Sequence, residues 1–99
     1  MNIVEKYGGT SVGTIEQIQA IALHAKRMKE QGHNLVIVAS AMGKTTNKLI
    51  ELAHSVTNNP NKRELDSLLS TGEQQTITLL AIAMNSIGVD AISLTGYQA

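Results

Sequence analysis

A lysine beside two glycines and two hydroxyl groups is the first set of residues in this chain that could do chemistry. Residues 6–13 read KYGGTSVG and lie between a short apolar segment and a long helical pattern, which predicts a strand, a glycine turn and a helix start. The N–H groups of such a turn, the positive end of a helix and a nearby ammonium group all attract phosphates. A lysine buried at that helix start, as we expect for Lys6, is costly unless an anion accompanies it. The alternative is an ordinary tight turn, for which a glycine pair is also typical.

A second turn, at residues 40–46, combines small residues with hydroxyl groups. Gly43, Lys44 and Thr45 follow an apolar run and resemble the end of a P-loop. That motif also needs a glycine five residues before Gly43, where this chain has Val38, so a P-loop is disfavoured. The hydroxyl groups of this turn could contact a small substrate, or the two threonines could simply cap the next helix.

A third polar group, residues 70–74, reads STGEQ. Its glutamate, Glu73, opens a predicted helix, where the helix dipole favours an acidic side chain whatever its function. A functional interpretation is also open, because this carboxylate could pair with the ammonium group of a substrate.

The composition excludes several classes of function. The chain has 99 residues, 42% of them hydrophobic, with eight acidic and eight basic side chains and no cysteine. Cancelling charges argue against nucleic-acid or membrane-surface partners, and the lack of cysteine excludes disulfides and thiolate metal sites. The histidines, His24, His33 and His54, are separate from one another and more typical of surface positions than of metal ligands. With no secretion signal and no membrane-length apolar run, we expect a cytoplasmic protein without a metal site of its own.

Three strand-forming runs alternate with helical patterns, which predicts an α/β fold with right-handed crossovers and a parallel sheet. We expect strands at residues 2–7 and 35–39 and the start of a third at residues 91–94. The middle run lacks polar alternation, which is typical of a parallel strand covered on both faces. Ligands gather at the carboxyl ends of such strands, so the turns that follow them, the third at residues 95–98, are expected to lie near ligands.

Four helices are expected between these strands. They run from Thr14 to the stop at Gly32, from residue 46 to 56, from Asn61 to residue 69, and from residue 73 to the stop at Gly88. Thr14 and Gln17 have the capping-box spacing, and Asn61 can cap the third helix. We expect residues 70–72 to end the third helix, so that Glu73 begins the last one. That helix is apolar on most sides, which predicts that it is largely buried.

The chain stops directly after the third expected strand. Three strands with these helices could hardly shield both faces of a sheet, and the outer strand edge would be left unpaired. We therefore expect these residues to be part of a larger domain.

The three motifs in this order resemble the amino-terminal segment of aspartate kinase (aspartokinase). The resemblance rests on residues 6–12, 38–47 and 70–74, with further matches at residues 62–66 and 95–99. It implies the parallel-sheet amino-acid kinase (carbamate kinase-like) fold, which is unrelated to P-loop enzymes. Residues 1–99 would form the amino-terminal portion of one such domain, without the regulatory ACT domains.

The resemblance also implies an activity. Members of the family transfer the γ-phosphoryl group of ATP, with Mg²⁺, to the side-chain carboxylate of L-aspartate, which gives 4-phospho-L-aspartate. This is the first step of the lysine, threonine and methionine pathway. Because the acceptor is already a carboxylate, catalysis needs positioning and electrostatic stabilisation rather than a strong base.

The family's functional residues map onto positions of this chain. Lys6 matches the catalytic lysine that stabilises charge on the transferring phosphoryl group. The positions that match ATP-binding residues are Lys6, Tyr7, Gly8, Gly9, Thr10 and Ser11. The positions that match aspartate-binding residues are Ser40, Thr46 and Glu73, with Glu73 facing the α-ammonium group. The family residues that hold the adenosine and the aspartate carboxylates are missing, so we expect the 99 residues alone to be inactive.

Two alternatives stay open at this point. The first is another amino-acid kinase, acting on glutamate, acetylglutamate or carbamate, although residues 70–73 together with residues 40–43 disfavour it. The second is a non-catalytic association module or truncated subunit, which would self-associate or pair with the rest of the enzyme through its exposed sheet and helices.

Overall fold

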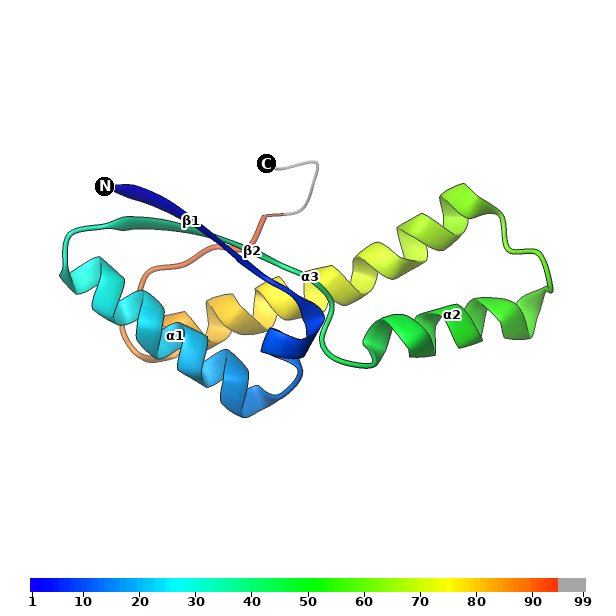
Figure 1. The fold of residues 1–99 in the computed structure, drawn as a ribbon, viewed down its shortest axis with the longest axis horizontal. Coiled ribbons are helices and arrows are strands. Elements are labelled where there is room, and N and C mark those ends of the chain that lie inside the picture. The colour runs from blue at the N-terminus through cyan, green and yellow to red at the C-terminus, as the bar shows by residue number, and fades with distance from the viewer. Residues whose placement is uncertain (95–99) are drawn as a thin grey trace.

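A computed structural model describes residues 1–94 of the chain, which form an α/β arrangement of two parallel strands and three α-helices (Figure 1). The elements in order are β1 (Asn2–Tyr7), the short 3-10 helix η1 (Gly9–Val12), α1 (Ile15–Glu30), β2 (Asn34–Ala39), α2 (Thr45–Val56) and α3 (Lys62–Ser86). The turn expected at residues 95–98 lies outside the described residues. No helix within residues 1–94 is both long and apolar enough to cross a membrane.

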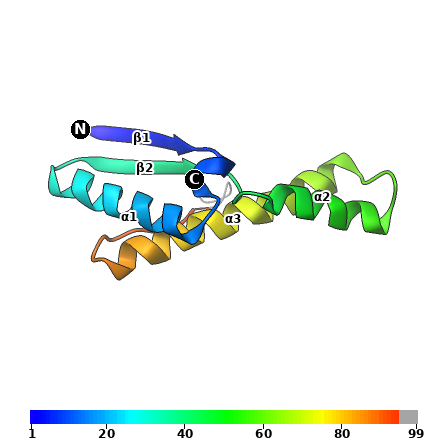
Figure 2. The same ribbon diagram turned by 60° about the horizontal axis from the view of Figure 1, so that its bottom comes forward.

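The two strands pair in parallel, as the sequence predicts, with Lys6 beside Val38 and Tyr7 beside Ala39. Helices α1 and α3 lie together on one side of this sheet (Figure 2). The prediction that β2 is covered on both faces is therefore wrong for the described chain: Val36 and Val38 are 58% and 46% exposed on the other side. That uncovered side of β1 and β2 is called the open face below.

The helix α1 is fixed at both ends by the predicted signals. Thr14 and Gln17 form a capping box at its start, and Gly32 follows its end with a φ of +88°, a conformation that suits glycine. The helix buries Ile18 and Ile21 against the sheet and α3. The central core cluster consists of Val12, Ile18, Ile21, Ala39 and Leu80.

The helix α3 differs from its prediction, because one helix of 25 residues replaces two shorter ones. The Ser70 and Thr71 hydroxyls, which favoured a break, donate instead to the carbonyls of Ser67 and Leu68 one turn earlier, at 2.6 and 2.7 Å. Such local bonds are compatible with a continuing helix. The helix is also less buried than expected, with Ile82 59% exposed, because it is covered on one side only.

The third strand is absent from the described chain. Residues 91–94 follow the predicted stop at Gly88 but have no strand pairing, and the Ala91 amide donates to Asn85 Oδ1 at 3.0 Å. The apolar composition that predicted a strand remains exposed, with Ile92 81% exposed. A cavity of about 620 Å³ lies between this segment and the elements β2 and α3, and no third strand pairs with β2 within residues 1–94.

The helix α2 packs against the first half of α3, and the pair projects from the sheet as an arm (Figures 1 and 2). This arm makes the described molecule elongated, with extents of 50 × 27 × 18 Å. Asn61 caps α3 at the tip, as predicted, by accepting from the Glu64 amide at 3.2 Å. The base of the arm lies where both strands end, which is where the sequence motifs meet.

Candidate functional site

The turns after the two strands form one continuous backbone unit. The Ser40 amide donates to the Tyr7 carbonyl at 3.0 Å, and the Gly43 amide donates to the Gly9 carbonyl at 3.1 Å. Both strands end at the same level because they are parallel and in register. The structure thus confirms that the first two motifs meet at the carboxyl ends of the strands.

The third motif reaches the same place through the middle of α3. A Cβ atom on Gly72 would lie 2.9 Å from the Ala41 Cβ and 3.2 Å from the Thr45 Cγ2. Contacts under 3.0 Å are not tolerated, so glycine is needed for α3 to approach the second turn this closely. Gly72 therefore brings Glu73 and its neighbours to the end of the sheet.

The two glycines of the first turn have different roles. A Cβ atom on Gly9 would lie 3.0 Å from the Ala41 carbonyl oxygen, so the fold itself favours glycine there. Gly8 has an extended backbone (φ −80°, ψ 173°) that any residue can adopt. No described atom lies within 4 Å of a Cβ built on Gly8. Packing within residues 1–94 does not explain why position 8 is a glycine, whereas close approach of a ligand to the backbone would.

Lys6 lies on the open face of the sheet, two residues before Gly8. Along β1 the half-buried residues alternate with exposed ones, and Lys6 belongs to the exposed set together with Val4. The expectation of a buried lysine is wrong for the described residues, because no helix covers this face. A ligand that contacts both Lys6 and Gly8 would therefore lie at the strand end on the open side.

The start of α1 carries the predicted capping box and does not follow directly on the glycine pair. Gln17 Oε1 accepts from the amides of Gly13 and Thr14 at 2.8 and 3.1 Å, and Thr14 Oγ1 accepts from the Gln17 amide at 3.2 Å. These bonds fix the entry to α1, where the Gln17 amide is bonded to the capping side chain, and η1 separates the helix from Gly8. At η1 the Ser11 amide donates to the Gly8 carbonyl at 3.0 Å. The preceding amides, at positions 9 and 10, remain outside the helical ladder and are available to an anion.

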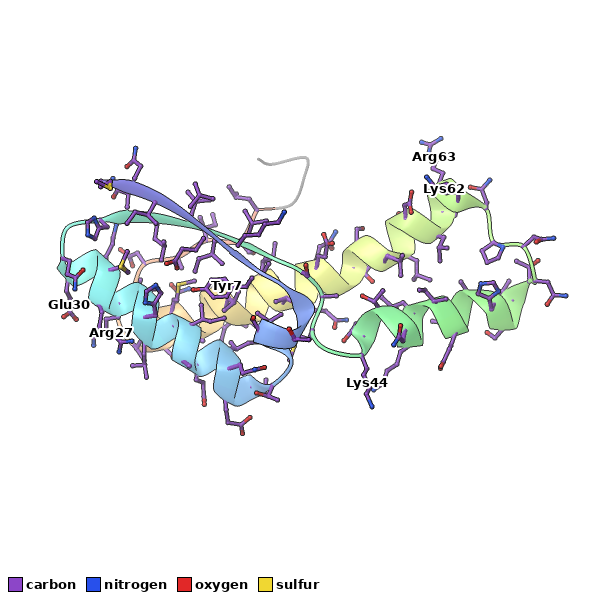
Figure 3. The ribbon with its side chains drawn as sticks, in the orientation of Figure 1. Tyr7, Arg27, Glu30, Lys44, Lys62 and Arg63 are labelled. Atoms are coloured by element: carbon purple, nitrogen blue, oxygen red, sulfur yellow. The ribbon has the colours of Figure 1, made fainter. Side chains whose placement is uncertain are left out.

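The second turn leads into a helix that lacks a side-chain cap. Lys44 is the N-cap residue of α2 and makes no capping bond within the described chain, so capping by Thr45 or Thr46 is wrong as an explanation of these hydroxyls. Thr46 is exposed in the first turn of α2, and Ser40 is exposed directly after β2. Figure 3 shows the Lys44 side chain extending outward from the start of α2, unlike a P-loop lysine that turns back over its loop.

Glu73 is exposed in the middle of α3 rather than at a helix start, so the helix dipole does not explain it. Its side chain lines the 620 Å³ cavity together with Ser70 and Gln74. The same cavity is lined by Val38 and Ala39, the last residues of β2. The Glu73 carboxylate and the end of β2, which leads to Ser40, therefore line the same cavity.

Tyr7 lies on the helix side of β1, where its ring packs against the core (Figure 3). Its hydroxyl donates to Glu5 Oε1 at 3.0 Å, and His24 Nε2 lies 2.8 Å from Glu5 Oε2. Burial and then the Glu5 carboxylate raise the pKa of Tyr7 to about 12. Burial would raise the pKa of Glu5, but hydrogen bonds from His24 and Tyr7 and the His24 charge outweigh it and lower that pKa.

Sequence reasoning missed this group of Glu5, Tyr7 and His24. The spacing of Glu5 and Tyr7 places both on one face of a strand, which was a usable signal. The contribution of His24 depends on how α1 packs on β1, which the pattern does not reveal. Within residues 1–94, no three His, Asp or Glu side chains are grouped so that they could hold a metal ion.

Comparison with known proteins finds similar sequences and a similar structure. The model of the amino acid kinase family matches residues 1–99. Aspartokinase 2 of Bacillus subtilis (strain 168) is 54% identical over 97 residues, which are 98% of this chain and 24% of that protein. Aspartokinase of Geobacillus stearothermophilus has the same identity and coverage. The chain thus spans about a quarter of the length of the curated relatives it matches.

A solved structure is similar over almost the whole chain. The crystal structure of aspartate kinase from Synechocystis has a TM-score of 0.94 and 55% sequence identity. The match covers 99% of this chain and 17% of that one.

Proposed function

The chain belongs to the amino acid kinase family, and on this basis we propose that it carries part of the active site of an aspartate kinase. The reaction is transfer of the γ-phosphoryl group of ATP to the side-chain carboxylate of L-aspartate, which gives 4-phospho-L-aspartate and opens the route to lysine, threonine and methionine. The observation that carries this proposal is the meeting of three polar motifs, held by Gly9 and Gly72, at one end of the sheet.

The first motif is suited to the phosphates of ATP. Gly8 leaves its backbone open to a ligand, and the amides of Gly9 and Thr10 lie at the start of η1. Lys6, two residues before Gly8 on β1, would add an ammonium group. The positions that we propose for ATP binding are Lys6, Tyr7, Gly8, Gly9, Thr10 and Ser11. Mg²⁺ would accompany the phosphates of ATP, whose oxygens are ligands that it prefers.

The second and third motifs are suited to the amino-acid substrate. The Glu73 carboxylate faces the cavity beside the end of β2, where it can pair with the α-ammonium group of aspartate. Ser40 and Thr46 offer exposed hydroxyl groups on the second turn. Hydrogen bonds from these hydroxyls would orient the acceptor toward the nucleotide.

This arrangement supplies the kind of catalysis that the reaction needs. The acceptor is a carboxylate, which is already a nucleophile near neutral pH, so no general base has to remove a proton. What remains is to bring two anions together and to stabilise negative charge on the transferring group. We assign that electrostatic role to Lys6, which is the catalytic residue of the proposal.

We also propose a place for the chain in its enzyme. With a quarter of the length of its relatives, it would be the amino-terminal portion of one kinase domain and would be inactive by itself. The open face of the sheet, with Val4, Val36 and Val38 exposed, would pair with the rest of the enzyme or with another copy. The enzyme would act in the cytoplasm on ATP and L-aspartate, without nucleic-acid or membrane partners.

The amino-acid half of the proposal is tested by Glu73→Gln in the complete enzyme. Loss of a charged hydrogen bond to the α-ammonium group is expected to raise the KM for aspartate about 10- to 100-fold. The KM for ATP should change little, because Glu73 lies in another motif. Initial-rate kinetics with each substrate varied in turn separate the two constants.

A matched control is Glu64→Gln, which makes the same change on α3 near the tip of the arm. It should leave both constants unchanged. An unaltered KM for aspartate in Glu73→Gln, or a rise confined to the KM for ATP, would contradict the role of Glu73.

A further inference from the structure

Tyr7 connects the two turns of the site. It is the last residue of β1, directly before Gly8, and its carbonyl accepts from the Ser40 amide at 3.0 Å. The glycines that follow have no side chains with which to anchor themselves. The position of the phosphate-binding turn is therefore set by backbone contacts, such as the bond from the Gly43 amide to the Gly9 carbonyl, and by its neighbours, Tyr7 before it and the fully buried Val12 after it.

The Tyr7 side chain is held by a carboxylate that uses both of its oxygens. Glu5 Oε1 accepts from the Tyr7 hydroxyl at 3.0 Å, and Glu5 Oε2 lies 2.8 Å from His24 Nε2. Glu5 is 23% exposed and His24 36% exposed at their side chains, so the pair is partly shielded from water. Within residues 1–94, this is the only side-chain hydrogen bond that joins α1 to the sheet.

The charges that act on this group come from its own members. Among the described residues, His24 is the one charged group that shifts the pKa of Glu5, and Glu5 is the one charged group that shifts the pKa of Tyr7. The other elements on this face contribute apolar side chains, including Ile37 of β2 and Met84 of α3. Arg27 follows His24 by one turn of α1 and is exposed.

We propose that Glu5 is a positioning residue for the phosphate-binding turn, acting through Tyr7 and anchored to α1 by His24. The inference rests on the proposed function, in which Gly8, Gly9 and Lys6 receive the phosphates of ATP. Loss of the carboxylate leaves the half-buried Tyr7 hydroxyl without its acceptor, and the end of β1 is then free to shift. Because Lys6 and Gly8 flank Tyr7 in the chain, both move with it.

The kinetic test compares Glu5→Leu, Glu5→Gln and the unchanged complete enzyme. Glu5→Leu keeps the bulk of the side chain and removes both acceptors, so the KM for ATP is expected to rise about tenfold, which corresponds to one ordinary hydrogen bond. The KM for aspartate should not change. Glu5→Gln retains an oxygen for the Tyr7 hydroxyl and should recover most of the ATP affinity.

Coupling through Tyr7 is tested by a double-mutant cycle. Once Tyr7→Phe has removed the hydroxyl, Glu5→Leu should add little to the KM for ATP. Glu16→Gln, on the exposed first turn of α1, is the control and should leave the KM for ATP unchanged. An unchanged KM in Glu5→Leu, or effects of Glu5→Leu and Tyr7→Phe that simply add, would overturn the proposal.

An NMR measurement, which does not depend on enzyme activity, tests this proposal independently of the kinase assignment. In the ¹⁵N-labelled chain, Glu5→Leu is expected to shift the amide signals of Gly8 and Gly9, while that of Gly32, at the opposite end of α1, stays in place. Glycine-turn signals that stay unshifted would refute the positioning role even in an active enzyme. Shifted signals in an enzyme that does not phosphorylate aspartate would uphold the positioning and refute the kinase assignment instead.

Discussion

Replacing Lys6 with methionine is expected to lower kcat of the complete enzyme by about two to three orders of magnitude, the usual effect of removing a group that stabilises charge in a transition state. Methionine keeps most of the length of the side chain and removes the ammonium group. Lys6 is exposed within residues 1–94, so the change should cost the packing of these residues little stability. The effect is therefore expected in the chemical step rather than in folding.

Single-turnover kinetics with saturating ATP measure that step directly. Lys44→Met is the matched control, because Lys44 lies in the second turn and is the lysine that a P-loop would use. Its side chain extends outward from α2 in Figure 3, and we expect its loss to leave kcat nearly unchanged. A large loss in Lys44→Met with normal turnover in Lys6→Met would reverse the assignment of the two lysines.

A valine at position 72 is the second change for which we expect a large effect. A Cβ atom there would lie within 3.4 Å of Ala41, Thr45 and Leu49, two of which belong to α2. Overpacking of this kind costs about 1–3 kcal/mol of unfolding free energy. Because the same contact holds α3 against the second turn, Gly72→Val should also separate Glu73 from the strand ends and abolish most activity.

Urea unfolding and initial rates, measured on the same preparation of the complete enzyme, test this prediction. Thr71→Val is the control, since it places the same side chain at the neighbouring exposed position of α3. Thr71→Val should have the same unfolding free energy and the same initial rate as the unchanged enzyme. If Gly72→Val were as stable and active as Thr71→Val, the close contact between α3 and the second turn would not hold the site together.

The elements with strong local signals were predictable from the sequence. The parallel pair of strands follows from two apolar runs joined by a helix, and α1 is bounded by a capping box and by Gly32 at positive φ. These signals act over a few residues and do not depend on distant packing. The meeting of the first two motifs followed as well, because parallel strands end at the same edge of a sheet.

Features that depend on tertiary packing were not predictable. Residues 70–72 have low helix propensity, but the free energy of packing Gly72 against α2 outweighs the small local preference for a break. The apolar run at residues 91–94 predicted a strand, yet a strand also needs a partner at the right distance. The exposure of Lys6 depends on which face of the sheet the helices cover, and both choices fit the same alternating pattern.

The candidate site shows the same division. The polar side chains of each motif could be listed from their types and spacing, including Lys6 and Glu73. The two glycines could not be distinguished, because only the structure shows that Gly9 meets the Ala41 carbonyl and that Gly8 has open space. The link from Tyr7 through Glu5 to His24 depends on the packing of α1, because Glu5 and His24 are 19 residues apart.

The acceptor itself is the most direct test of the proposed function. The complete enzyme is incubated with ATP, Mg²⁺ and one acceptor at a time (aspartate, glutamate, acetylglutamate or carbamate), and any acyl phosphate is trapped with hydroxylamine, as a hydroxamate from the amino acids and as hydroxyurea from carbamate. We expect hydroxamate with aspartate and no more than a trace with the other three. Efficient transfer to one of the others would make the protein a different amino-acid kinase, and no transfer to any of them would favour a non-catalytic association module.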